Sequence, residues 1–157
     1  MSPPRDRATL DMFTDWQPPV LVQRFQEIQV RAATLQRRVS LAVAETLKAA
    51  AREGEDRRAE IAARMSDWLG ETVTPNMLDK YASQEADHNI TVVRLLGLIH
   101  ATGDVRLLQL MAEMFGHSVI ENKWLPWVEV GQLADCKDEL DKSFDAARRK
   151  ARKAMRS

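Results

Sequence analysis

Apolar residues recur three and four positions apart in each apolar segment of this 157-residue chain, and this spacing constrains the fold more than any other feature. Such spacing places side chains on one face of an α-helix. No segment of useful length alternates apolar and polar residues as a half-buried strand does, and the sequence contains no internal repeat. The sequence therefore predicts an all-α protein.

The longest helical pattern begins at Val22 and continues for about thirty residues. It predicts one long N-terminal helix that ends at Gly54. A heptad seam runs along it: Phe25, Ile28, Ala32, Leu35, Val39, Ala42 and Thr46. A seam over roughly three heptads suits pairing with a second helix, but a long helix lying on its own domain gives the same pattern. Both interpretations remain open at this point.

Four shorter helices are predicted next, each with its own start or stop signal. Gly70, Gly103 and Gly116 are expected to end helices. Thr74 is a good N-cap, and Pro75 occupies the first helical position, where its missing N–H costs nothing. The expected ranges are 56–70, 74–83, 91–102 and 104–115.

The C-terminal part is expected to be a linker followed by a basic helix. Pro126 is expected to break any helix around it, so the last helix is expected from about Leu133. One stripe of that helix carries Leu133, Cys136, Leu140, Phe144, Ala147 and Ala151. Trp124 and Trp127 are expected to cover the core, although a partner-binding patch is the alternative. The expected organisation is an extended or disordered arm (1–20), a helical domain (21–117), and a linker with a C-terminal helix for oligomerisation or DNA contact (118–157).

Residues 57–83 have the pattern of a helix-turn-helix, in which the second helix presents its outer face to the DNA major groove. Val73, Leu78 and Tyr81 are the expected anchors. The predicted base-contacting residues are Thr74, Asn76, Met77, Asp79, Lys80 and Ser83. Asn pairs with adenine, Lys reaches guanine acceptors, and Thr or Met touches a thymine methyl group. The predicted phosphate contacts are Arg57, Arg58, Arg64, Arg148, Arg149, Lys150, Arg152 and Lys153.

Two stretches, "RRAEIAARMSDWLGETVTPNMLDKYAS" and "ITVVRLLGLIHATGDVRLLQLMAEMFG", resemble the helix-turn-helix of small phage regulators of the CII and Cro/repressor type. The resemblance covers about residues 38–117. The arm, "RDRATLDMF...W.PP", is similar to early-region proteins of Mu-like transposable phages. The resemblance implies a lambda-repressor-like core, double-stranded DNA as partner, and transcription regulation inside a bacterial host cell. The chain departs from the family pattern by about three extra residues before Gly70 and by Asp79, a carboxylate on the would-be DNA face.

Charge distribution leaves two functions open. The chain has no net charge, but residues 55–117 hold six basic and ten acidic residues. Because DNA affinity depends on neutralising phosphates, this acidity favours the alternative of a non-catalytic adaptor whose core binds protein. The tail "RRKARKAMR" (148–156) has six basic residues and no acid, so it is either a solvated helix end or an arm that grips phosphate. A dimer pairing through the stripe at Leu133 would bring two such arms to one duplex.

The arm carries a second candidate contact, "TLDMF" (9–13). It resembles the short motif, Gln followed by Leu-Asp-Leu-Phe, by which bacterial replication proteins dock on the sliding clamp. Leu10, Met12 and Phe13 are the apolar residues that would fill a groove on such a partner, while Thr9 stands where the motif has Gln. Folding of these side chains onto their own domain is the alternative.

Enzyme chemistry is not expected. The six glycines are scattered, so no phosphate-binding loop forms, and three distant histidines with a single cysteine do not make a zinc site. We therefore expect neither a metal nor a cofactor. The lone Cys136 suits a reducing compartment, and the N-terminus lacks the apolar core of a signal peptide. Together with the absence of a long apolar run, these features predict a cytoplasmic protein that contacts no membrane.

Overall fold

The computed structural model describes residues 20–51, 56–83 and 88–155. Every regular element within these ranges is a helix, which confirms the all-α prediction. The described residues fall into two units. One unit is Val22–Val119, and the other contains residues 20–21 and 120–155.

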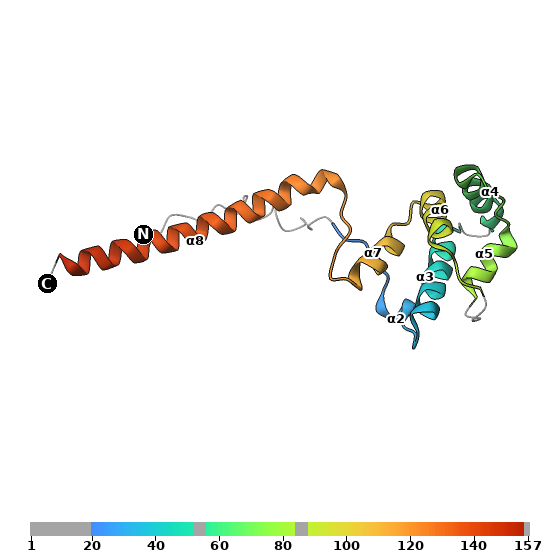
Figure 1. Ribbon diagram of the computed structural model, residues 1–157, viewed down its shortest axis with the longest axis horizontal. Coiled ribbons are helices and arrows are strands. Elements are labelled where there is room, and N and C mark those ends of the chain that lie inside the picture. The colour runs from blue at the N-terminus through green and yellow to red at the C-terminus, as the bar shows by residue number, and fades with distance from the viewer. Residues whose placement is uncertain (1–19, 52–55, 84–87, 156–157) are drawn as a thin grey trace, which may run out of the picture. The chain divides into compact units, whose positions relative to one another are not determined.

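The first unit is a cluster of short helices around one apolar core (Figure 1). Its helices are α2 (Glu27–Val30), α3 (Leu35–Ala50), α4 (Arg58–Leu69), α5 (Pro75–Ala82), α6 (Val92–Thr102) and α7 (Arg106–Glu113). α4 packs mainly against α6, and α5 packs against α3 and α4. The largest fully buried apolar side chains are Val43, Met65, Leu78, Leu98 and Leu107. Each comes from a different helix, so all of α3–α7 share one core.

The prediction of one long N-terminal helix is wrong. The helix is interrupted after Val30, residues 31–34 are not helical, and Thr34 caps α3 by accepting a hydrogen bond from the Arg37 backbone N–H at 3.3 Å. Val30 is buried, whereas Ile28 is 83% exposed, so the expected seam is not a continuous apolar face. The expected end of this helix at Gly54 lies outside the described residues.

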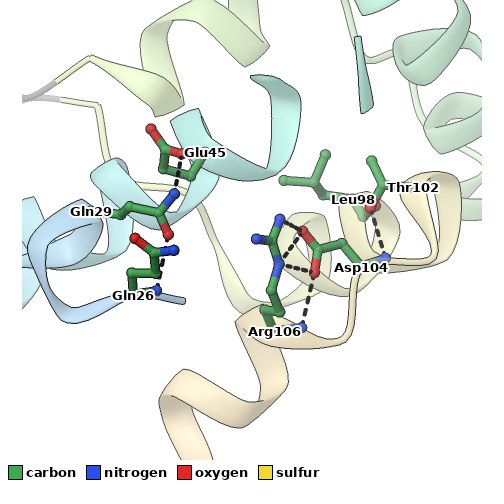
Figure 2. Close-up of polar contacts among 7 residues, drawn as sticks. All are labelled: Gln26, Gln29, Glu45, Leu98, Thr102, Asp104 and Arg106. Atoms are coloured by element: carbon green, nitrogen blue, oxygen red, sulfur yellow. Dashed lines mark hydrogen bonds and ion pairs between the residues drawn. The ribbon is translucent and has the colours of Figure 1, made fainter. Parts of the chain in front are cut away.

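Polar contacts explain why the chain turns there (Figure 2). Gln26 and Gln29 form a capping box around the first turn of α2. The Gln29 side chain also donates a hydrogen bond to Glu45 of α3 at 3.0 Å, which ties α2 back onto α3. Heptad spacing alone could not reveal this contact, because it joins side chains sixteen positions apart.

Most predicted helix boundaries are confirmed. Gly70 and Gly103 end α4 and α6 in the left-handed conformation, with φ of 68° and 72°, which favours glycine. Thr74 caps α5 by accepting a hydrogen bond from the Met77 backbone N–H at 3.4 Å, and Pro75 follows in the first turn. α7 ends at Glu113, before the predicted stop at Gly116.

The turn between α6 and α7 depends on Asp104, as Figure 2 shows. Its carboxylate accepts hydrogen bonds from the Arg106 backbone N–H at 3.0 Å and from the Arg106 guanidinium at 2.7 to 3.1 Å. The same guanidinium lies 4.5 Å from the centre of the Phe25 ring, which holds the segment before α2 against the core. Burial opposes ionisation of Asp104, but the hydrogen bonds and charge of Arg106 outweigh it and lower the pKa of Asp104 below its ordinary value of 3.8.

We expect Asp104→Asn to reduce the dependence of stability on acid pH. A carboxyl with a lowered folded pKa contributes stability above its unfolded pKa, and this contribution is lost as pH falls through the folded pKa. Urea unfolding between pH 7 and pH 3 measures the effect. The wild type should lose more of its free energy of unfolding than the variant, with exposed Asp67→Asn on α4 as the control. Equal slopes for wild type and Asp104→Asn would contradict the assignment.

The second unit contains one long helix, α8 (Leu125–Ala154), preceded by a 3₁₀ turn, η1 (Asn122–Trp124). The expectation that Pro126 breaks the helix is wrong, because Pro126 lies in the first turn of α8, where a missing N–H breaks no helical hydrogen bond. Every residue of α8 is exposed. Trp127, expected to cover the core, is 67% exposed. Across the described residues, no helix is long and apolar enough to cross a membrane.

Candidate nucleic-acid interface

The turn that joins α4 to α5 is held by the side chain of Ser66. The Ser66 hydroxyl oxygen accepts a hydrogen bond from the Val73 backbone N–H at 2.9 Å, and the hydroxyl donates to the Ala62 carbonyl oxygen at 2.8 Å. Val73 itself is buried. The direction in which α5 leaves the turn is therefore fixed by contacts to α4 rather than by the turn sequence alone.

α5 is anchored through its buried face. Leu78 and Tyr81 are buried as predicted, at 0% and 7% exposure. Arg94 of α6 donates hydrogen bonds to the Tyr81 hydroxyl and, at 2.9 Å, to Glu71 in the turn. The bonds to Glu71 and Tyr81 raise the pKa of Arg94, so its charge is stabilised in the folded state. One guanidinium thus connects α6, α5 and the turn.

The predicted base-contacting residues lie on or beside the outer face of α5. Asn76, Asp79, Lys80 and Thr74 are exposed, while Met77 and Ser83 are half-buried. Two of the six candidates have hydroxyl groups that bond their own helix: Thr74 is the N-cap, and the Ser83 hydroxyl donates to the Lys80 carbonyl oxygen at 2.8 Å. Asp79 is paired with Arg58 of α4, so Asn76 and Lys80 are the polar side chains of this face for which no hydrogen bond or ion pair is found among the described residues.

The predicted phosphate-contacting residues of α4 are mostly paired with carboxylates. Arg58 forms ion pairs with Asp79 at 2.7 Å and Asp56 at 3.1 Å, and its hydrogen bond to Asp56 is the main cause of its raised pKa. Arg57, at the start of the same helix, pairs with Glu60 at 2.6 Å. Arg64 is exposed. The ion pair between Arg58 and Asp79 partly neutralises the carboxylate that made α5 an unfavourable DNA face.

The other predicted site residues lie in the second unit or outside the described residues. Arg148, Arg149, Lys150, Arg152 and Lys153 lie exposed on α8, in the second unit. Leu10, Met12 and Phe13, the predicted peptide contact, lie outside the described residues. Dimer formation, the DNA arm and the clamp contact stay predictions.

Ser66, Glu71 and Arg94 position the outer face of α5 without belonging to it, and no sequence pattern pointed to them. A serine inside a helix pattern gave no signal that it bonds the following turn. The bond from Arg94 to Glu71 joins residues 23 positions apart, a separation at which spacing carries no information.

Comparisons with known proteins found no matching family model, no matching curated protein and no matching solved structure. Within the described ranges, no group of three or more His, Cys, Asp or Glu side chains is placed to hold a metal ion. The candidate interface therefore has to be judged from its own geometry and charge.

Ser66→Ala should destabilise the first unit by about 1–3 kcal/mol, because the buried Val73 N–H loses its acceptor. Ser83→Ala is the matched control, since its hydroxyl bonds an exposed carbonyl at the end of α5. Urea unfolding gives the free energies, and amide exchange at Val73 reports the turn directly. Unchanged exchange at Val73 in Ser66→Ala would show that the hydroxyl does not hold the turn.

Proposed function

We propose that α4 and α5 form a helix-turn-helix and that the protein is a sequence-specific DNA-binding regulator of the phage type, with α5 as its recognition helix. The observation that carries the proposal is the division of α5 into two faces. Leu78 and Tyr81 are buried, while Asn76 in the first turn of α5 and Lys80 in its last turn are exposed. The N-terminal residues of a recognition helix are those that reach base edges.

The tight fixation of α5 supports this proposal. Recognition of base edges by bidentate hydrogen bonds needs side chains held in a defined orientation. The bonds of Ser66 to Val73 and of Arg94 to Tyr81 supply that orientation from two different helices.

The ion pair between Arg58 and Asp79 gives the proposed interface a second property. On binding, Arg58 would exchange Asp79 for a phosphate, and Asp79 would be free to accept from cytosine N4. Non-specific DNA offers the phosphate but not the cytosine in the right place. The pair therefore lowers affinity for random DNA more than affinity for the preferred site.

We expect Asn76→Ala to weaken binding to a preferred site by roughly 1–3 kcal/mol and binding to random DNA by much less. Asn89→Ala is the matched control, because Asn89 is exposed in the same unit but lies outside α5. Fluorescence anisotropy with both duplexes measures the difference. Equal losses on both DNAs would contradict the assignment of α5 as the recognition helix.

We expect Asp79→Asn to raise affinity for random DNA, because it removes a carboxylate from the face and releases Arg58 to a phosphate. The slope of log K against log salt should steepen by about one phosphate contact. Glu113→Gln on α7, whose carboxylate pairs with Arg24 at 2.8 Å, makes the same change in net charge away from α5. A similar gain in both variants would show that only net charge matters.

A non-catalytic protein-binding adaptor is the second candidate. It is favoured by an apolar surface on α4 and α6 in which Trp68, Val92, Val93 and Leu96 are 40–68% exposed. Trp68 stacks on His100, with ring centres 4.8 Å apart, so the surface continues along α6. The sliding-clamp contact through residues 9–13 belongs to this alternative. DNA binding by the purified protein that enriches no sequence would favour it.

A further inference from the structure

α8 carries an apolar stripe whose residues are all exposed. Its members are Leu133, Cys136, Leu140, Phe144, Ala147, Ala151 and Ala154, spaced three or four residues apart. Leu133 and Leu140 are each 70% exposed and Phe144 is 66% exposed. Helical propensity alone does not require an apolar face. The stripe on this thirty-residue helix therefore indicates a surface that packs against a partner.

Residue size changes along the stripe. The first half contributes Leu133, Cys136 and Leu140, while the second half contributes three alanines. Phe144 lies between the halves. A second copy of the same stripe running in the opposite direction would therefore place each leucine against an alanine.

The charge of α8 also differs between its first and second parts. Residues 129–145 hold six acidic and two basic side chains, whereas residues 148–153 hold five basic side chains and no acid. All of them are exposed. All but one of these acidic residues precede Phe144, and all of the basic residues in 148–153 follow it.

We propose that two copies of this chain pair through α8 in antiparallel orientation, with the two-fold axis next to Phe144. In this register Leu133 faces Ala154 of the partner subunit, Cys136 faces Ala151 of the partner subunit, and Leu140 faces Ala147 of the partner subunit. The two Phe144 rings meet at the axis. Large side chains then fill the space left by small ones, as close packing between helices requires.

The same register pairs opposite charges beside the apolar seam. By helical spacing, Lys150 and Glu139 flank one side of the stripe, and Arg148 and Asp141 flank the other. Antiparallel pairing brings Lys150 close to Glu139 of the partner subunit and Arg148 close to Asp141 of the partner subunit. Parallel pairing would instead place the five basic residues of each chain side by side and leave alanine facing alanine.

The proposed pairing is independent of whether α5 binds DNA, and it changes what the basic tail can do. Arg148 and Lys150 would be occupied by the partner, while Arg149, Arg152 and Lys153 lie away from the seam and stay available to phosphates. The two Leu125 residues, where the helices begin, would be about 57 Å apart along the helix axis at 1.5 Å per residue. The distance between the two Leu125 residues is thus longer than one helical turn of DNA, which is the usual spacing between the half-sites of a dimeric regulator.

The single cysteine of the chain makes the orientation testable. In a parallel dimer Cys136 would face Cys136 of the partner subunit and could form a disulfide with it. In the proposed dimer the two Cys136 residues lie about 24 Å apart along the helix axis. Mild oxidation of the full-length wild type with copper–phenanthroline should therefore give no covalent dimer. Ala151→Cys should give a covalent dimer whose disulfides join positions 136 and 151, as identified by peptide mass spectrometry.

Ala146→Cys is the matched control, because it adds a cysteine near the axis but about 120° from the centre of the stripe. It should not form the dimer. Links between two copies of position 136, or no link between 136 and 151, would overturn the proposal.

Sedimentation velocity tests the pairing without cysteine chemistry. The wild type at about 100 µM should sediment as a dimer, and Phe144→Asp should sediment as a monomer. Val128→Asp is the control, since Val128 is exposed on α8 but lies off the stripe. The unfolding transition of the first unit, followed by circular dichroism, distinguishes a misfolded variant from one that folds but does not pair. A monomeric wild type, or a dimeric Phe144→Asp, would contradict the proposal.

Discussion

Burial of Leu78 and Tyr81 is the constraint on which the proposed interface depends. Because these two side chains enter the core, the opposite face of α5 must be exposed, and Asn76 and Lys80 lie on it. Ser66 and Arg94 then fix how α5 rotates and where it leaves the turn. The buried face thereby decides which side chains α5 presents.

Ion pairs within the first unit limit how strongly the exposed face of α5 could attract DNA phosphates. Four of the six basic residues in 55–117 form ion pairs with carboxylates: Arg57, Arg58, Arg94 and Arg106. Such pairs hold the helices together but leave little positive charge for phosphates. Proposed DNA recognition would therefore rest on the fit of a few side chains and on charge from α8, where antiparallel pairing would leave part of the basic tail available.

Sequence patterns located the short helices well, because their boundaries depend on local chemistry. Thr74, Pro75, Gly70 and Gly103 act through neighbouring backbone groups, and the structure confirms each of them. The same patterns failed where distant residues decide. Spacing predicted one long helix where a hydrogen bond from Gln29 to Glu45 holds α2 against α3, and no spacing rule could show that Arg94 reaches Tyr81.

The most direct measurement of the central proposal, recognition of DNA by α5, is selection from a random pool of duplexes. Fluorescence anisotropy would first establish binding at low and near-physiological salt, and sequencing would follow for the duplexes that stay bound. We expect an enriched motif, and we expect Asn76→Ala to lose preference at defined positions of that motif. Binding that disappears with salt and enriches no sequence would contradict the proposed function.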